Sequence, residues 1–292
     1  MSDVAHEVTR VISSEPAGAY RHLVLAAPTI ARYAAPGQFV AATVGGPTSG
    51  LLLRRSFSIH AIDPDAGTVE IVVAAHAAGT TWITERRLGD ELDLVGPLGQ
   101  PFPLPAKPGP DGRTSAVLVG GGYGSAPLFW LARVLRQQGI RVEVVLGAAS
   151  ADRLFGVELA GEVADAVEVT TDDGSAGTRG WVSDVLSDVL TRSGAGDVYA
   201  CGPMAMLKTV SDAAQAAGAR AHVAVEEAMA CGVGVCMTCV MPVVGPDGRT
   251  RMVRSCVEGP VFDGSRVRWD AFDDGLCRVP ADAVGAPQAE GH

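Results

Sequence analysis

The sequence predicts an antiparallel β-barrel, then an α/β domain with a parallel sheet, then a small cysteine-rich domain. Three observations support this prediction. Short runs of alternating apolar and polar residues fill the first hundred positions, strands and helices then alternate, and four cysteines follow within 231–256. A chain of 292 residues is long enough for about two domains with cores of their own. We place the barrel at 1–104, the α/β domain at 113–222, the cysteine-rich domain at 223–278 and a flexible tail at 279–292.

The barrel prediction rests on evenly spaced strands that are separated by Gly, Pro and Asp. Such spacing is typical of small antiparallel barrels. The stretch PLPAKPGPDGRTS, which starts at Pro103, is rich in Pro, Gly and charge and reads as a linker. The strand-like runs are YRHLVLAAP, GQFVAATV, RRSFSIHAI, GTVEIVVAAH and DELDLVGPLG.

The α/β prediction starts at Ala116, where AVLVGG reads as an apolar strand that leads into a glycine-rich turn. An amphipathic helix then runs to Gly139. Further strands alternate with helices, which implies a parallel sheet covered by helices. The later strands are RVEVVLGA, DAVEVTTDDG and DVYACGP, and the later helices are TRGWVSDVLSDVL and MAMLKTVSDAAQAAG.

Composition and charge exclude several classes of protein. A net charge of −10 argues against a protein that neutralises nucleic-acid phosphates. The N-terminal MSDVAHEVTRVISSEP lacks the pattern of a secretory signal, so we expect a cytoplasmic location, where clustered cysteines favour metal or redox roles over disulfides. Residues 228–245 carry no charge, but their Gly, Pro and Cys content is poor helix material, and we interpret them as a buried loop rather than a membrane span.

The cysteine spacing is the most specific signal. Cys231, Cys236, Cys239 and Cys256 follow the order C-x4-C-x2-C-x16-C, which is the plant-type pattern of ligands to a [2Fe–2S] cluster. Glycines between the first two cysteines let the loop turn its N–H groups toward such a cluster. Structural zinc sites usually pair two C-x2-C units, and buried unliganded cysteines are the plainest alternative. Cys277 lies outside the pattern.

Three segments of the α/β domain predict a dinucleotide site at the carboxyl edge of its sheet. The turn in VLVGGGYGSAPL leaves room for a pyrophosphate at a helix N-terminus, although its last fingerprint position is Pro127 and tight turns without ligands are common. TTDDGS and YACGPMAM both follow predicted strands, and Cys201 is expected near a nicotinamide ring or as a buried strand end. The candidate residues are Gly120, Gly121, Gly122, Gly124, Asp172, Asp173, Cys201, Gly202 and Pro203.

The strand RRSFSIH predicts a flavin site. Arg55 can neutralise a diphosphate, and Ser58 can reach a flavin ring atom, whereas an arginine-rich strand by itself is more often a solvated edge. Further along, GTTW opens a possible helix whose first residues, Gly79 and Thr80, are placed to bind phosphate.

With these segments together, the chain resembles the ferredoxin–NADP reductase superfamily and, within it, the electron-transfer subunits of type B dihydroorotate dehydrogenase. The resemblance runs from the barrel to Trp269. The motifs are LLRRSFSI, AAGTTW, GPLG, VGGGYGSAPL, VTTDDGSAGTRGWV, CGPMAMLK and EEAMACGVGVCMTC…RSCVEGPVF. The resemblance implies that FAD is held by Arg55, Ser56, Phe57, Ser58, Val72, Val73, Ala74, Gly79 and Thr80. Glu226, Glu227 and Met229 match the lead-in to the cluster and are expected to shape that loop.

The resemblance also implies a function. The chain would pass electrons from an FMN-containing dihydroorotate dehydrogenase catalytic subunit through the [2Fe–2S] cluster and FAD to NAD⁺, as part of a hetero-oligomer in pyrimidine biosynthesis. We expect NAD rather than NADP, because the turn after the second α/β strand offers only Arg153 to a 2′-phosphate. No side chain is expected to act as an acid or base.

Other functions stay open at this point. A related flavin/iron–sulfur NAD(P)H reductase subunit could serve ferredoxin, sulfide or hydrogenase chemistry. A stand-alone oxygenase reductase would carry a ferredoxin domain longer than the segment between His222 and Phe272. A zinc-stabilised nucleotide-binding regulator would bind neither flavin nor iron.

Overall fold

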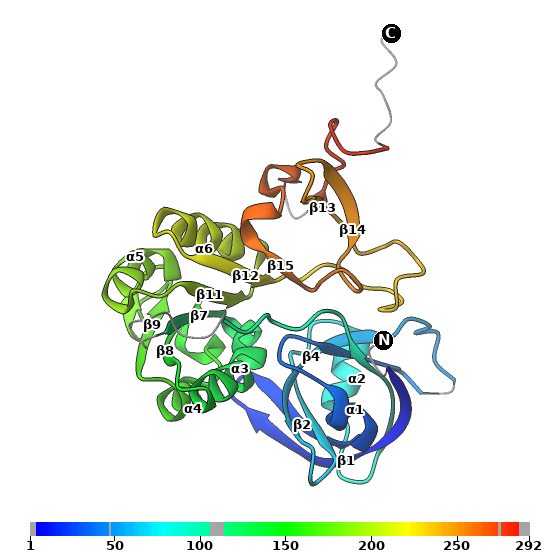
Figure 1. Cartoon of the computed structure of the whole chain (residues 1–292). Helices are drawn as coiled ribbons and strands as arrows, with labels where there is room; N and C mark the ends of the chain where they lie inside the picture. The colour runs from blue at the N-terminus through cyan, green and yellow to red at the C-terminus, as the bar shows by residue number, and fades with distance from the viewer. Residues whose placement is uncertain (1–3, 47, 106–113, 274–275, 286–292) are drawn as a thin grey trace.

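A closed six-stranded antiparallel barrel forms the N-terminal part of the computed structural model, which describes residues 4–46, 48–105, 114–273 and 276–285 (Figure 1). Apolar side chains alternate along the strands and fill the barrel interior, as Leu23, Leu25 and Ile71 do. The predicted barrel is confirmed. Its strands, in the order β1-β2-β5-β4-β3-β6, are β1 (Ala5–Ala17), β2 (Tyr20–Ala26), β3 (Phe39–Ala42), β4 (Arg55–Asp63), β5 (Thr68–Val73) and β6 (Glu91–Leu98), and its helices are α1 (Pro28–Tyr33) and α2 (Ala78–Thr84).

A seven-stranded sheet with helices on both faces forms the second part. Side chains of α3 (Ala126–Gln137) and α4 (Val157–Val163) enter one core, and side chains of α5 (Val182–Ser193) and α6 (Met204–Ala216) enter another. The core strands are parallel, as predicted. In sheet order the strands are β10 (Thr178–Arg179), β9 (Ala166–Thr171), β8 (Arg141–Ala148), β7 (Ser115–Gly121), β11 (Asp197–Cys201), β12 (Arg220–Ala224) and β15 (Val261–Asp263).

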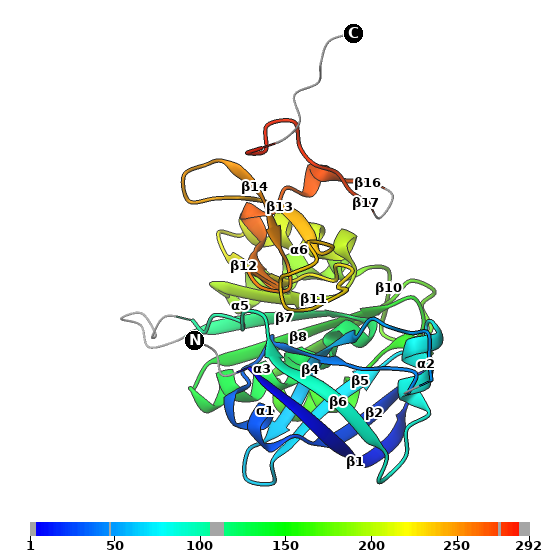
Figure 2. The ribbon, with the colours of Figure 1, turned by 90° about the vertical axis from the view of Figure 1, so that its right-hand side faces the viewer.

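The C-terminal segment both extends this sheet and forms a hairpin of its own. Strand β15 pairs antiparallel with β12, so part of the cysteine-rich segment belongs to the α/β sheet. The hairpin consists of β13 (Val240–Val244) and β14 (Thr250–Arg254), which turn at Pro246, and a short pair, β16 (Phe272–Asp273) and β17 (Leu276–Cys277), follows. Figure 2 shows the barrel, the sheet and this hairpin one above another.

Two expectations for this segment need correction. Residues 228–239 form an irregular loop that is partly exposed rather than buried, because Val233, Val235 and Met237 face solvent. Residues 279–285 of the predicted flexible tail are held in place, since the Val284 amide donates to the Thr250 carbonyl at 2.8 Å and Asp282 pairs with Arg268 at 2.8 Å. Most of the predicted linker lies outside the described residues. Among the described helices, none has the length and apolarity needed to span a bilayer.

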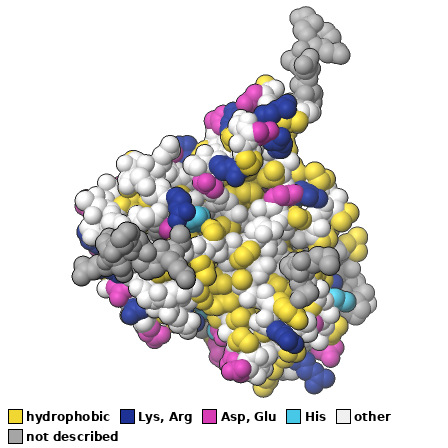
Figure 3. All heavy atoms as spheres, in the orientation of Figure 1, with side chains coloured by type: hydrophobic (Ala, Val, Ile, Leu, Met, Phe, Trp, Pro, Cys, Tyr) yellow, Lys and Arg dark blue, Asp and Glu magenta, His cyan; other side chains and the backbone are white. Residues whose placement is uncertain are grey.

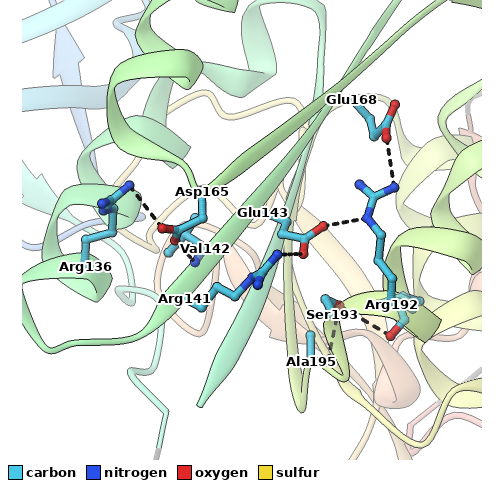
Figure 4. A network of polar contacts seen from close by, with 10 residues as sticks. Arg136, Arg141, Val142, Glu143, Asp165, Glu168, Arg192, Ser193 and Ala195 are labelled. Atoms are coloured by element: carbon cyan, nitrogen blue, oxygen red, sulfur yellow. Dashed lines mark hydrogen bonds and ion pairs between the residues drawn. The ribbon is translucent and has the colours of Figure 1, made fainter. Parts of the chain in front are cut away.

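A charged network closes the amino edge of the sheet, away from the carboxyl ends of its strands (Figure 4). The carboxylate of Glu143 is almost fully buried on β8 and accepts hydrogen bonds from Arg141 at 2.9 Å and Arg192 at 3.0 Å. Arg192, in the last turn of α5, also bonds Glu168 on β9 at 2.8 Å. A buried carboxylate is costly unless it is paired in this way, so the network fixes α5 on the sheet.

Candidate functional site

A cavity of about 370 Å³ lies between the outer face of the barrel and the start of α3. Ser56, Phe57 and Ser58 on β4 and Val72 on β5 line it, together with Gly124 from the glycine-rich turn. Val73, predicted along the flavin ring, does not line it. Side chains alternate along a strand, so Val73 points into the barrel core, while Ala74 packs in the core around α3.

Arg55 and Gly79, predicted together at a diphosphate, come from different segments but meet in the structure. A Cβ atom on Gly79 would lie 2.8 Å from Arg55 Nε and 3.1 Å from Arg55 Cζ, so only glycine lets the guanidinium lie against the first turn of α2. The guanidinium also donates to the Leu53 carbonyl at 2.6 Å, which fixes its direction. The pair therefore presents a cation beside backbone amides, a combination suited to phosphate.

The Thr80 hydroxyl, in contrast, forms its hydrogen bonds within the protein. It accepts hydrogen bonds from the amides of His76 at 2.9 Å and Ala77 at 3.1 Å, and it donates to the Ala77 carbonyl at 3.0 Å. The side chain thus caps α2 and is not free for a ligand, which leaves only the Thr80 backbone for the predicted phosphate contact.

A second, larger cavity of about 550 Å³ opens along the carboxyl edge of the parallel sheet. Figure 3 shows apolar side chains gathered where the barrel and the α/β part meet. Gly121, Gly122, Asp172 and Pro203 line the cavity, as expected for a dinucleotide site. Its other lining residues include Tyr20, His76, Tyr123, Ala148, Ala149, Arg153, Thr170, Trp181, Val182, Met206, Thr209 and Glu226.

The remaining predicted glycines act in packing. A Cβ on Gly120 would come within 2.5 Å of the Ser125 side chain, and a Cβ on Gly124 would lie 2.8 Å from Gly202 Cα. Gly202 itself has φ +154° beside the Gly121 backbone. These three positions let two turns approach closely, while Gly121 and Gly122 remain open to the cavity.

The two cavities meet at Tyr123 and Glu226, which line both. Burial raises the pKa of Tyr123 to about 12, and burial also raises the pKa of Glu226. The exposed surface of Glu226 faces the two cavities, where protein surrounds the carboxyl group. Cys201 lines the smaller cavity, and burial, with the Glu226 carboxylate nearby, raises the pKa of its thiol.

Sequence reasoning missed several of these lining residues. The sequence places Tyr20 in a strand, Tyr123 in a turn and Trp181 in a helix, and it predicts for Glu226 only a part in shaping the cluster loop. No local signal marks Tyr20, because the fold alone brings β2 to the mouth of the larger cavity. Trp181 carried a usable signal, since a large aromatic residue just before a helix start is unusual on a solvated surface.

The four cysteines of the spaced motif form two pairs. The Cys231 sulfur accepts hydrogen bonds from the amides of Val235 at 3.4 Å and Cys236 at 3.5 Å. Hydrogen bonds from Thr238 and then Cys231 lower the pKa of Cys236 to about 6, whereas burial and the adjacent Cys239 raise the pKa of Cys256 to about 12. Gly232 and Gly234, with φ of +72° and +81°, give the loop the turns that the sequence predicted.

This arrangement fits a two-iron cluster better than a zinc ion. Four sulfurs around one zinc would lie about 3.8 Å apart, given Zn–S bonds of about 2.3 Å in tetrahedral geometry. In the part of the chain that the structure describes, no three of the four sulfurs lie within 4.8 Å of one another. Two separated pairs and amides directed at sulfur suit a [2Fe–2S] cluster instead.

An apolar bridge joins the cysteine loop to the smaller cavity. Cys239 and Cys256, 2% and 1% exposed, pack with Phe39 of β3 and with Leu98 of β6. Phe39 also lines the smaller cavity, and so does Met229, which packs on the same apolar group. The buried cysteine pair thus faces the smaller cavity, and Cys236 of the other pair is exposed.

A polar cluster of His22, His60 and Glu70 lies between the barrel and α3, outside both cavities. His60 is the extra residue of a β-bulge in β4, since Ile59 pairs with Ile71 and Ala61 pairs with Glu70. The bulge turns His60, only 4% exposed, toward α3, where its Nδ1 donates to the Ala126 carbonyl at 2.6 Å. His22 bonds Glu70 at 2.8 Å. Each group has a protein partner, which explains the cluster as an interface between the two parts of the chain.

His60 makes stability depend on pH. Burial lowers the pKa of His60, and its neighbours His22 and Arg133 also lower it, while Ala126 and Glu70 act in the opposite direction. As the pH falls through about 6.5, His60 therefore binds a proton in the unfolded chain but not in the folded chain. The contribution of His60 to stability is present above pH 6.5 and is lost progressively below it. Between pH 7.5 and 5.5 we expect a loss of up to about 1.4 kcal/mol from this group.

The variant His60→Phe should flatten that acid dependence. Its melting temperature at pH 7.5 should fall slightly, because one hydrogen bond worth about 1 kcal/mol is gone. Its further drop at pH 5.5 should be smaller than in the unmodified protein. His6→Phe, at an exposed position, is the control. Equal acid sensitivity of all three proteins in calorimetry would contradict the assignment.

The barrel, the sheet with its edge cavity and the paired cysteines define an iron–sulfur flavoprotein of the ferredoxin–NADP reductase type. Residues 226–268 match the model of the iron–sulfur cluster binding domain of dihydroorotate dehydrogenase B. The chain is 40% identical over 263 residues to the electron transfer subunit of dihydroorotate dehydrogenase B (NAD(+)) from Shouchella clausii (strain KSM-K16), covering 87% of this chain and 95% of the relative. It is 34% identical over 244 residues to the subunit of the same name from Desulforamulus reducens, covering 84% and 90%.

This chain belongs to the family of dihydroorotate dehydrogenase B electron transfer subunits. A solved structure of an NADH-dependent reduced ferredoxin–NADP oxidoreductase superposes with a TM-score of 0.77 at 30% identity, covering 90% of this chain and 91% of the other. The ferredoxin reductase of carbazole 1,9a-dioxygenase shares the fold, with a TM-score of 0.59 at 21% identity, covering 74% and 67%. The matches confirm the predicted cofactors FAD, [2Fe–2S] and NAD.

Proposed function

We propose that this chain passes electrons from an FMN-containing dihydroorotate dehydrogenase catalytic subunit, through its [2Fe–2S] cluster and FAD, to NAD⁺. The observation that carries the proposal is the continuous order of three sites: the paired cysteines, the smaller cavity and the larger cavity. The apolar bridge at Phe39 and Met229 joins the first two, and Tyr123 is shared by the last two. FAD, when bound, exchanges hydride with a nicotinamide and single electrons with an iron–sulfur cluster. The order of the sites matches the order of those transfers.

The chain's own residues place the cofactors. Ser56, Phe57, Ser58 and Val72 would hold the flavin in the smaller cavity, with Arg55 and the Gly79 backbone at its diphosphate. Gly121, Gly122 and Pro203 would hold the dinucleotide, and Cys201 would lie near the flavin, since it lines the smaller cavity. Because hydride transfer needs the two rings in contact, the nicotinamide belongs at the shared end, beside Tyr123 and Glu226.

The exposed side of the cysteine loop supports a docking surface for the catalytic subunit. Val233, Val235 and Met237 are exposed around Cys236, the cysteine of the motif that faces solvent. Leu52 and Leu53, in the loop between β3 and β4, are also exposed, and Figure 1 shows both loops on the same side of the molecule. Exposed apolar side chains next to an electron-transfer centre suit a partner that must approach it closely.

Reconstitution tests the proposal. The holoprotein, mixed with an FMN-containing dihydroorotate dehydrogenase subunit, should form a stable complex that reduces NAD⁺ when dihydroorotate is added. Val235→Asp, at a position 80% exposed, should weaken complex formation by about tenfold or more, because a charge is then buried at the interface. Val8→Asp, at an exposed position on the barrel, is the matched control.

The outcomes separate the proposal from its main alternative. A chain that binds no such subunit but reduces NAD⁺ with reduced ferredoxin would favour a ferredoxin-linked reductase, which the similarity to the NADH-dependent reduced ferredoxin–NADP oxidoreductase supports. Equal loss of binding in both Asp variants would place the partner elsewhere. A cytoplasmic site of action is part of the proposal, and the six free cysteines are consistent with reducing conditions.

A further inference from the structure

The larger cavity has two distinguishable ends. Tyr123 and Glu226, shared with the flavin-side cavity, lie at one end. Asp172 and Trp181 lie beyond β9 and at the start of α5, and sheet order places β9 two strands from β7 and three from β11. If the nicotinamide occupies the shared end, the adenosine half of the dinucleotide must extend over the carboxyl ends of β8 and β9.

At that far end, two adjacent aspartates have different environments. The carboxylate of Asp173 accepts hydrogen bonds from the Ser175 amide at 2.9 Å and from its hydroxyl at 2.6 Å, so it holds the turn after β9. Asp172 lines the cavity, and no hydrogen bond or ion pair of its carboxylate is found among the described residues. Its backbone amide donates to the Ala148 carbonyl at 3.1 Å, which fixes Asp172 beside the end of β8.

The residues that line the larger cavity carry little positive charge. Arg153 is the one Lys or Arg among the described residues that line this cavity, and its Nε lies 3.8 Å from the Asp152 carboxylate. Ala148 and Ala149, which follow in the chain at the end of β8, carry no charge. A 2′-phosphate would therefore meet a carboxylate and a single, already paired guanidinium. A ribose 2′-hydroxyl could instead donate to Asp172.

Trp181 completes this end. Its side chain is 67% exposed although it lines the cavity, and it directly precedes α5. An indole left open beside a nucleotide cavity offers a flat face for an adenine ring, and such stacking does not depend on the 2′ substituent.

We propose that Asp172 selects NAD(H) over NADP(H) by accepting a hydrogen bond from the adenosine 2′-hydroxyl and repelling a 2′-phosphate, while Trp181 covers the adenine. This inference rests on the proposed use of the larger cavity for the dinucleotide. In this assignment the Asp172 carboxylate determines the preference for NAD(H) over NADP(H), and the Trp181 indole contributes to the affinity for both nucleotides.

Binding to the oxidised holoprotein tests the assignment without turnover. Dissociation constants for NAD⁺ and NADP⁺ are measured by quenching of tryptophan fluorescence and by calorimetry. The unmodified protein should bind NAD⁺ at least about tenfold more tightly than NADP⁺. Asp172→Asn should reduce that ratio about tenfold, and Trp181→Ala, measured by calorimetry alone, should weaken both nucleotides by similar factors. Asp188→Asn, an exposed aspartate on α5 outside the cavity, should leave the ratio unchanged.

Several results would overturn the assignment. The ratio could stay unchanged in Asp172→Asn, or it could shift equally in Asp188→Asn. If Asp172→Asn does not fold, competition on the unmodified protein decides, since 5′-AMP should displace NAD⁺ more effectively than 2′,5′-ADP, and the reverse order would refute the proposal. Selective NAD⁺ binding without electron transfer from a dihydroorotate-oxidising subunit would refute the proposed function and leave this inference intact. Absence of binding of either nucleotide would refute both.

Discussion

Cys256→Ser should remove most of the iron and acid-labile sulfide from the purified protein while FAD remains bound. Cys256 is almost fully buried and is paired with Cys239 against the barrel, so its loss removes a proposed cluster ligand on the side that faces the smaller cavity. Reduction of NAD⁺ by dihydroorotate in the reconstituted complex should fall by roughly 100-fold or more, the scale reached by changes even outside the ligand shell of a metal site. Bleaching of the flavin by NADH should persist, because that transfer does not cross the cysteines.

Cys277→Ser is the matched control for this experiment. Cys277 lies on β17, outside the spaced motif, so it is not placed as a ligand. Iron analysis, visible spectra and electron paramagnetic resonance of the dithionite-reduced proteins measure the outcome. Retention of a full cluster in Cys256→Ser, or its loss in Cys277→Ser, would overturn the ligand assignment. Zinc in place of iron in anaerobically purified protein would restore the zinc alternative.

Gly79→Val should yield protein that has lost most of its FAD but keeps its iron. A Cβ at this position lies 2.8 Å from Arg55 Nε, and the two methyl groups of valine need still more room, so the guanidinium must leave the first turn of α2. A lost charge-assisted contact of about 1.5–3 kcal/mol corresponds to roughly 10- to 100-fold weaker FAD binding. The flavin absorbance per polypeptide after gel filtration, and titration of the apoprotein with FAD, measure the change.

Gly161→Val separates a local effect from a general one. Gly161 lies in α4, and a Cβ there meets no atom within 4 Å, so this variant should keep its FAD. Arg55→Lys tests the same contact from the other side, because lysine keeps the charge but loses the planar fork of donors. It should weaken FAD binding less than Gly79→Val does. Normal FAD content in Gly79→Val would show that Arg55 and the α2 turn do not hold the diphosphate.

The cysteine loop shows how far local sequence can predict a site. The spacing of Cys231, Cys236, Cys239 and Cys256 predicts the ligand set, since a cluster constrains how many residues the chain needs between its ligands. The spacing says nothing about orientation. Packing of Cys239 and Cys256 against Phe39 and Leu98 of the barrel, some 140 to 220 positions earlier in the chain, decides which pair faces the smaller cavity.

In the proposed flavin and nucleotide sites, too, local sequence predicts some features and the tertiary structure decides the others. Alternation along β5 could have shown that Val72 and Val73 face opposite sides, but only the closed barrel determines which side carries the cavity. The roles of the two aspartates after β9 are equally hidden, because Asp172 and Asp173 have the same side chain and differ only in direction. A residue such as Tyr20 enters the larger cavity through a contact that no local pattern encodes.

The amino-acid order alone determined the strands and helices, the glycine turns and the cysteine quartet, because each depends on neighbours within about twenty-five positions. Tertiary structure decided that β15 completes the α/β sheet, that Arg55 meets Gly79, and that two cavities join at Tyr123 and Glu226. These features require contacts between distant segments. Such contacts form only when buried surfaces fit together, and no short stretch of sequence contains both surfaces.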